Sequence, residues 1–285
     1  MADFSNVLLA VDFDRTLTDR HSQIPQNNLD AIRAFTAQGG TFTVATGRSV
    51  PMFRHYQALV PVNAPFILYN GAACYDYRTE TLTQTVPIPD GESILRELLT
   101  DYPMLWTEIQ GIDYHYLFGD CPMRDEYYRF NDAAATHTDV EHLPKPLLKF
   151  AMYGNFVAPT VASLFEDELQ ELPMINRITD ELLKRYGDRL TVDRAAPRII
   201  DLQDKTVSKG SAARKLADQL GKTVLVCAGD AKNDISMLRA ADLAYVPSDC
   251  SPEVAALGFR TVCPCTDGAI AGLISRLEDD LSSIP

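Results

Sequence analysis

The stretch VLLAVDFDRTLTD, Val7–Asp19, decides the fold that we expect for this chain. It begins with a run of small and branched apolar residues, which is typical of a strand buried on both faces. The run ends in two aspartates, Asp12 and Asp14, although an ionised carboxylate leaves water only at a cost of several kcal/mol. Side chains alternate along a strand, so the two carboxylates project to the same side if the strand continues. The pair of aspartates therefore predicts that a functional site lies at the end of this strand.

The first and last thirds of the chain alternate between strand-like and helix-like segments. In the first third, apolar runs predict strands at 7–13, 41–46 and 65–72, and helices are predicted at 25–40 and 49–60. The last third repeats this order, with helices predicted at 208–221, 231–241, 251–258 and 267–281 and strands at 223–230, 243–247 and 260–263. This alternation predicts an α/β fold, with a Rossmann-like parallel sheet and helices on both of its faces.

The middle of the chain has a different pattern, which predicts a separate α+β domain inserted into the α/β domain. Alternating segments predict a hairpin at 79–88 and strands at 104–110, 113–119 and 147–155, and amphipathic segments predict helices at 91–102 and 160–172. We expect residues 1–76 and 197–285 to form the core domain and residues 77–196 to form the inserted cap domain. An insertion between strands of a parallel sheet lies over their carboxyl ends, where such sheets bind ligands.

The composition limits the classes of function. With 26 basic and 39 acidic side chains, the formal net charge is −13, which argues against general binding to nucleic acid or to an anionic membrane. No apolar stretch approaches the roughly 18 residues of a membrane-spanning helix, and the N-terminus has no signal-peptide pattern. The six cysteines form no Cys-x-x-Cys pair. We therefore expect a cytoplasmic protein with a small-molecule partner; the sequence does not predict its oligomeric state.

Polar side chains follow the predicted parallel strands at the points where these strands end. Asp12 and Asp14 follow the first strand. The others lie just after later strands or at the start of an adjoining helix: Thr46, Gly47, Arg48, Asn70, Lys209, Asp230, Asn233 and Asp234. Because the carboxyl ends of parallel strands meet at one edge of a sheet, we expect these side chains to lie close together.

This set of residues suits phosphoryl chemistry. Several carboxylates repel one another unless a cation lies among them, and an all-oxygen ligand set favours a hard ion such as Mg²⁺. The Thr46 hydroxyl, the Gly47 amide and the Lys209 ammonium would hold an anion near that ion. A carboxylate can attack phosphorus to form an aspartyl-phosphate, and a second carboxylate can move protons for the leaving group and for water.

Four motifs carry a resemblance to a known family: DFDRTLT at 12–18, TGR at 46–48, SKG at 208–210 and GDAKND at 229–234. In this order they resemble the four motifs of the haloacid dehalogenase superfamily. A long insertion lies between the second and third motifs, and NGA occupies 70–72. Both features resemble the Cof-like branch (class IIB), whose members are phosphatases with a large α/β cap. The resemblance covers essentially the whole chain. It implies a Mg²⁺-dependent phosphatase for a small phosphorylated metabolite, with a sugar phosphate favoured over a phosphorylated cofactor.

The resemblance also implies a role for each motif residue. Asp12 is the nucleophile, and Asp14 is the general acid and base and a metal ligand through its carbonyl oxygen. The remaining roles are binding of phosphate or substrate by Thr46, Gly47, Arg48, Asn70, Lys209 and Asn233, and binding of the metal by Asp12, Asp14, Asp230 and Asp234. One position departs from the family pattern, because Arg15 stands where the family usually has glycine. Arg15 predicts either a different local backbone or a guanidinium over the cleft.

The same residue types also occur at positions that have only a structural role. Aspartates cap helices and occupy solvated turns, and Asn233 and Asp234 suit the start of a helix equally well. Among related activities, a hexose-phosphate mutase would use the same nucleophile but return the phosphoryl group to a sugar. A non-catalytic phosphometabolite-binding regulatory protein would keep the pocket without turnover. Release of inorganic phosphate separates a phosphatase from both alternatives.

Several side chains of the inserted segment are candidates for lining a substrate pocket. They are Trp106, Glu108, Tyr114, His115, Tyr116 and Arg124. Core packing is the more frequent role of aromatic residues in strand-like runs, so the pattern favours a structural role for most of them. The five histidines show no metal-ligand spacing.

Overall fold

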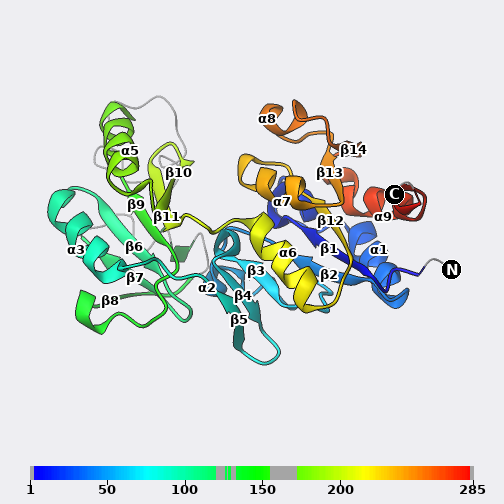
Figure 1. The fold of residues 1–285 in the computed structure, drawn as a ribbon, viewed down its shortest axis with the longest axis horizontal. Helices are drawn as coiled ribbons and strands as arrows, with labels where there is room; N and C mark the ends of the chain where they lie inside the picture. The colour runs from blue at the N-terminus through cyan, green and yellow to red at the C-terminus, as the bar shows by residue number, and fades with distance from the viewer. Residues whose placement is uncertain (1–2, 120–125, 127, 130–132, 155–171, 283–285) are drawn as a thin grey trace. The chain divides into compact units, whose positions relative to one another are not determined.

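The computed structural model describes residues 3–119, 126, 128–129, 133–154 and 172–282 (Figure 1). The chain divides into two compact units. The core unit comprises Met1–Arg48, His55–Gln84 and Ser208–Pro285, and the inserted unit comprises Ser49–Arg54 and Thr85–Val207. Arg124 and, apart from Leu172, the helix predicted at 160–172 lie outside the described residues. No helix in the described part of the chain is long and apolar enough to cross a membrane.

The core unit is built on a parallel sheet with the strand order β14-β13-β12-β1-β2. Its strands are β1 (Val7–Val11), β2 (Thr41–Val44), β12 (Val224–Ala228), β13 (Leu243–Pro247) and β14 (Arg260–Val262). β1 pairs in parallel with both β12 and β2, and Val11 stands opposite Ala228 and Val44. The carboxyl ends of these three strands therefore reach the same edge of the sheet.

β1 forms because all five of its side chains are apolar and buried, as expected of a strand covered on both faces. The prediction of a strand as far as Phe13 is too long, because the chain leaves the sheet after Val11 and turns tightly over Phe13–Leu17. Asp12 N still donates to Ala228 O at 2.9 Å. Asp12 is therefore held at the sheet edge, at the point where the turn begins.

Helices pack on both faces of the parallel sheet, as predicted (Figure 1). α6 (Lys209–Gln219) and α7 (Ile235–Ala240) lie side by side, and their residues share a hydrophobic cluster with Leu8 and Ala10 of β1. α1 (Gln26–Ala37) and α9 (Ala269–Leu281) pack against each other and complete the sandwich. α8 (Pro252–Ala255) is a single turn.

The helix predicted at 49–60 is much shorter than expected. α2 spans only Val50–Phe53, and residues 54–59 form turns. Leu59 is 58% exposed, so this segment has no continuous apolar face to bury as a helix.

A small antiparallel sheet extends the core unit. It contains β3 (Phe66–Leu68), β4 (Ala73–Asp76) and β5 (Thr81–Thr85). Ala45, which follows β2, forms a parallel bridge with Ile67 of β3, so β3 continues the parallel arrangement. The strand predicted at 65–72 ends at Leu68, because Tyr69–Gly71 forms a 3-10 turn. β5 lies within the hairpin predicted at 79–88, but its partner β4 precedes that segment.

The inserted unit has a six-stranded sheet with the order β10-β11-β9-β6-β7-β8. Its strands are β6 (Trp106–Gln110), β7 (His115–Phe118), β8 (Ala135–His137), β9 (Phe150–Tyr153), β10 (Leu190–Ala196) and β11 (Ile199–Asp204). The pairing is antiparallel except between β7 and β8. Two helices, α3 (Gly91–Asp101) and α5 (Leu172–Tyr186), share a hydrophobic core with this sheet. The unit is α+β, as predicted, although the sequence pattern predicts none of β8, β10, β11 and α5.

Candidate active site

Lys209 connects two of the predicted site carboxylates. Its Nζ donates to Asp12 Oδ1 and to Asp234 Oδ1, at 2.6 Å in each case. Lys209 is the first residue of α6, and the N-cap Ser208 accepts a hydrogen bond from Ser211 N, so the start of the helix positions the lysine. Burial disfavours the charged form of Lys209, but Asp12 and Asp234 outweigh it and raise its pKa above the usual range. The ammonium therefore stays charged.

Asp234 is held by backbone amides. Its Oδ2 accepts hydrogen bonds from Asp230 N and Ala231 N, each at 3.0 Å, and its side chain is fully buried. Gly229 permits this loop, since a Cβ at that position would lie 2.4 Å from Asp234 Cβ. Because both of its oxygens have partners, Asp234 is a fixed part of the site.

Asp230 has weaker partners than Asp234. Thr16 Oγ1 donates to its Oδ1 at 3.3 Å, and Arg15 Nε lies 3.9 Å from its Oδ2. Burial and the charge of Asp234 raise the pKa of Asp230 to about 6. The same two causes raise the pKa of Asp12 well above its usual range, against the effect of Lys209. The site thus holds more negative charge than its own cations neutralise.

Asp12, Asp230 and Asp234 form a possible metal site, which we call the carboxylate group. Each offers one oxygen, these oxygens lie within 4.8 Å of one another, and all three residues are buried. Carboxylate oxygens are the donors that Mg²⁺ prefers, and Mg²⁺ typically takes few protein ligands and keeps several waters. Burial and the charge of Asp234 raise the pKa values of Asp12 and Asp230, and a cation bound among the three carboxylates would offset both effects. The donor set therefore fits a hard divalent cation.

Asp14 has a different environment from Asp12. Arg48 binds both of its carboxylate oxygens, with Nε 2.9 Å from Oδ2 and Nη2 2.8 Å from Oδ1. The guanidinium lies over the rings of Phe13 and Tyr56, 5.5 and 5.0 Å from their centroids. The side chain of Asp14 is 44% exposed. One aspartate of the pair is thus buried on Lys209, and the other is half-exposed on Arg48.

Thr46, Gly47, Asn70 and Asn233 lie together. Thr46 O accepts from Asn70 N at 3.0 Å, and Asn233 Nδ2 donates to Asn70 Oδ1 at 3.3 Å. Gly47 lies close to Asn70, because a Cβ at position 47 would be 2.9 Å from Asn70 Oδ1. Asn70 has a φ of 55°, a conformation that asparagine tolerates better than most residues. The strand ends that carry TGR, NGA and GDAKND therefore meet.

All ten predicted site residues thus lie in the core unit, and their roles stay predictions. Sequence reasoning did not single out Tyr56, which supports Arg48. Tyr56 lies in the segment interpreted as a helix, and no motif marks it.

The candidate pocket residues of the inserted unit are mostly buried. Trp106, Glu108, His115 and Tyr116 are buried, whereas Tyr114 is 47% exposed. Trp106 stacks on Tyr153 with ring centroids 4.1 Å apart. The favoured structural role of these side chains agrees with their burial.

Glu108 is the centre of a buried polar cluster, which we call the Glu108 cluster. Its carboxylate accepts hydrogen bonds from Tyr128 Oη at 2.5 Å, Gln110 Nε2 at 2.8 Å and Tyr153 Oη at 3.2 Å. His115 Nδ1 lies 3.4 Å from Glu108 Oε1. Burial alone would raise the pKa of Glu108, but His115, Tyr128 and Gln110 outweigh it and hold the pKa below its usual range.

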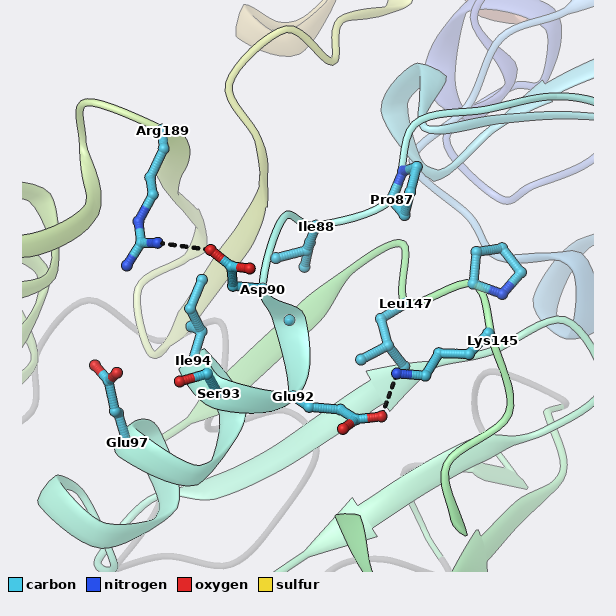
Figure 2. Close-up of a pocket in the computed structure, with 12 residues that line it drawn as sticks. Pro87, Ile88, Asp90, Glu92, Ser93, Ile94, Glu97, Lys145, Leu147 and Arg189 are labelled. Carbon is cyan, nitrogen blue, oxygen red and sulfur yellow. Dashed lines mark hydrogen bonds and ion pairs between the residues drawn. The ribbon is translucent and has the colours of Figure 1, made fainter. Parts of the chain in front are cut away.

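A pocket of about 760 Å³ lies in the inserted unit, and none of the predicted site residues line it (Figure 2). The two basic residues that line it are both paired with acidic ones: Lys145 with Glu92, and Arg189 with Asp90 at 3.5 Å. Glu97, which also lines the pocket, is paired with Arg185 at 2.6 Å, so the described lining residues offer no unpaired basic side chain. The pocket is therefore unsuited to a phosphate group, and the carboxylate group of the core unit is the better candidate for chemistry.

The chain is similar to known proteins along most of its length. A sequence profile of haloacid dehalogenase-like hydrolases matches residues 9–271. The Bacillus subtilis (strain 168) protein named "Putative phosphatase YxeH" is 27% identical over 89% of this chain and 92% of its own. The Escherichia coli (strain K12) pyridoxal phosphate phosphatase YbhA is 24% identical over 94% of this chain and 97% of its own.

The structure is similar to a solved structure described as the subclass IIB sugar phosphatase BT4131. The TM-score is 0.74 at 19% identity, and the match covers 95% of this chain and 98% of the other. At this level of identity the likeness shows a shared fold, which agrees with the predicted parallel-sheet core and inserted α+β domain.

Proposed function

Because the chain belongs to the haloacid dehalogenase-like hydrolases, we propose that it is a Mg²⁺-dependent phosphatase that hydrolyses a small phosphorylated metabolite through an aspartyl-phosphate on Asp12. The family was predicted from the motifs, and the relatives agree with a phosphatase-type enzyme. The observation that carries the finer proposal is the carboxylate group around Lys209, which is short of positive charge. A divalent cation would supply that charge.

Asp12 suits the role of nucleophile. It lies at the carboxyl end of the central strand, and Lys209 holds its Oδ1, which orients the carboxylate. In the proposed reaction Asp12 attacks phosphorus in line with the leaving oxygen, and the phosphorus–oxygen bond to the substrate breaks. Asp12, Asp230 and Asp234 would hold Mg²⁺, which supplies charge neutralisation for the transferring phosphoryl group.

Asp14 suits the transfer of protons. Its half-exposed carboxylate is accessible to substrate and water, and the two bonds from Arg48 fix its orientation. In this proposal Asp14 protonates the leaving alkoxide and then takes a proton from the water that hydrolyses the aspartyl-phosphate. Free enzyme and inorganic phosphate result.

The cluster of Thr46, Gly47, Asn70 and Asn233 suits the binding of phosphate oxygens. A hydroxyl, a backbone amide and two side-chain amides offer donors at the edge of the sheet. Gly71, which follows Asn70, lies against Ser208, the residue before Lys209. We propose a sugar phosphate as the first substrate to test. YbhA is named for pyridoxal phosphate, so a phosphorylated cofactor is the second. The predicted cytoplasmic location stays a prediction.

Phosphate release from a panel of sugar phosphates, pyridoxal phosphate and nucleotides tests the proposal. We expect release by the native protein with Mg²⁺, none with a chelator, and none by Asp12→Asn. Asp30→Asn is the matched control, because Asp30 is an exposed acid on α1. Transfer of phosphate between sugars without net release would favour a mutase, and substrate binding without release or transfer would favour a regulatory binder.

A further inference from the structure

Arg15 is a charged residue in a backbone conformation that does not favour it. It has a φ of 62°, in the left-handed region where side chains other than glycine, asparagine and aspartate are strained. Its side chain is 53% exposed, and its Nε lies 3.9 Å from Asp230 Oδ2. We propose that Arg15 is a resident counter-cation of Asp230, which competes with the metal ion for this carboxylate and so lowers the metal affinity of the site. The inference rests on the metal site of the proposed function.

The other cations near the carboxylate group are bonded to residues other than Asp230. Lys209 bonds to Asp12 and Asp234, but its bonds do not extend to Asp230. Arg48 is engaged with Asp14. Among the described residues, Arg15 is the cation that lies within ion-pair distance of Asp230. Without a metal, the balance of charge at Asp230 therefore depends on Arg15.

The turn fixes where the Arg15 side chain begins. Arg15 N donates to Thr18 Oγ1 at 3.1 Å, and Thr18 N donates to Phe13 O at 2.9 Å. Thr16, the next residue, donates to the other oxygen of Asp230. The backbone that strains Arg15 is thus the same backbone that places Arg15 and Thr16 on the two oxygens of one carboxylate. A residue other than glycine that is held in this strained conformation beside a candidate metal ligand points to a functional role.

The contact is suited to being displaced. At 3.9 Å the Nε–Oδ2 separation is an ion pair without a direct hydrogen bond, and half of the side chain is exposed. A partly exposed pair of this kind contributes little energy, so an entering divalent cation can take Oδ2 while the guanidinium moves into solvent. Metal binding must therefore break the ion pair between Arg15 and Asp230, and the lost ion-pair energy lowers the metal affinity.

Mg²⁺ titration of the metal-free protein, followed by calorimetry, tests the inference without any assay of activity. We expect Arg15→Ala to bind Mg²⁺ roughly two- to fivefold more tightly, the range that a partly exposed ion pair allows. Arg15→Lys should stay near the native affinity, because it keeps the charge. Arg15→Asn separates the effect of charge from the effect of backbone strain, because asparagine removes the charge and also relieves the strain, whereas alanine removes only the charge. If charge alone sets the affinity, Arg15→Asn should bind Mg²⁺ as tightly as Arg15→Ala.

Arg33→Ala is the matched control, since it removes an equally exposed arginine paired with Asp30 on α1. It should leave the Mg²⁺ affinity unchanged. Unchanged or weaker binding by Arg15→Ala, while Asp230→Asn loses binding, would overturn this inference and leave the metal site of the proposed function intact. Absence of Mg²⁺ binding by the native protein would overturn both.

Discussion

The carboxylate group of the core unit and the Glu108 cluster of the inserted unit both bury acidic side chains, but they differ in how these are neutralised. Glu108 accepts three hydrogen bonds and has His115 beside it, and its pKa is lowered. Asp12 and Asp230 have fewer favourable partners than their burial requires, and their pKa values are raised. The Glu108 cluster thus satisfies its buried charge from neighbouring side chains, and the carboxylate group does not.

This difference separates a structural role from a functional one. A buried carboxylate that its neighbours fully satisfy contributes to a unique fold and needs nothing from outside. A buried group of carboxylates that repel one another is unstable by itself, and it is retained where a cation or a substrate completes it. Substitutions in each cluster can test whether one is functional and the other structural.

The largest expected effect concerns activity. Asp12→Asn should lower the rate of phosphate release by about 10⁴-fold or more, since it removes the nucleophile. Glu108→Gln should stay within about tenfold of the native rate, because it changes a group that the fold already satisfies. Steady-state phosphate release with saturating Mg²⁺ measures both. An equal loss of activity in the two variants would contradict the assignment of a functional role to the carboxylate group and a structural role to the Glu108 cluster.

The next effect concerns stability in chelator, where the two clusters should respond with opposite signs. Glu108→Gln should lower the free energy of unfolding by about 2 kcal/mol, because its amide nitrogen would face a donor on either side: Tyr128 at the position of Oε2, or Gln110 and Tyr153 at the position of Oε1. Asp230→Asn should raise it by about 2 kcal/mol, because it removes a carboxylate whose pKa is raised by about two units.

Denaturant unfolding can assign these changes to the correct unit. Trp106 is the single tryptophan of the chain and lies in the inserted unit, so its fluorescence reports that unit, and circular dichroism reports both. Asp30→Asn is the surface control. A loss of stability in Asp230→Asn would show that the ion pair with Arg15 outweighs the repulsion within the carboxylate group.

The pH dependence of the stabilising contribution should also differ between the carboxylate group and the Glu108 cluster. The folded-state pKa of Asp230, about 6, exceeds its unfolded value near 3.8, so the folded state binds this proton more tightly. The metal-free core unit should therefore gain up to about 2 kcal/mol as the pH falls from about 7 to 4. Glu108 has a lowered pKa, so its contribution is present above about pH 4.5 and is lost only below it.

Denaturant unfolding in chelator at a series of pH values measures this contrast. Below about pH 4, protonation of Glu108 should shift the Trp106 transition to lower denaturant, and Glu108→Gln should remove this shift. Asp230→Asn should flatten the pH dependence of the core transition. A core unit that loses stability over the same range would contradict the excess of negative charge in the carboxylate group.

The smallest expected effect is that of the metal. Mg²⁺ at about ten times its dissociation constant should stabilise the core unit by about 1.4 kcal/mol, and the Trp106 transition should not move. Thermal or denaturant unfolding with Mg²⁺ and with chelator measures the shift. Asp230→Asn should abolish it, and stabilisation of the inserted unit instead would place the metal at a different site.

Sequence reasoning succeeded where the signal is local. The run Val7–Val11 predicts its strand because all of its side chains are apolar, and the polar residues that follow mark the sheet edge. The alternation of helices and strands is sufficient for the α/β core, because parallel strands require crossover helices. The ten candidate site residues were chosen from strand ends and, for Lys209, from the start of an adjoining helix, and their roles stay predictions.

The inserted unit shows where a local signal fails. β11 carries polar residues at alternate positions, which is typical of an exposed face. Asp201 is nevertheless buried in an ion pair with Lys149 at 2.6 Å. That partner lies far away in the sequence, so no window around β11 could predict its burial. The shortened α2 is a different case, because residues 54–59 lack a continuous apolar face and form turns instead.

The sequence by itself determined which chemical groups the core unit has, namely carboxylates, a lysine and amides at strand ends. Only the tertiary structure decided how they are paired. Parallel pairing of β1 and β12 brings Lys209 onto Asp12 from 197 positions away, and Arg48 reaches Asp14 from 34 positions away. Because the pKa of a carboxylate depends on its burial and on the distance to its neighbours, the different environments of Asp12 and Asp14 exist only in the folded chain.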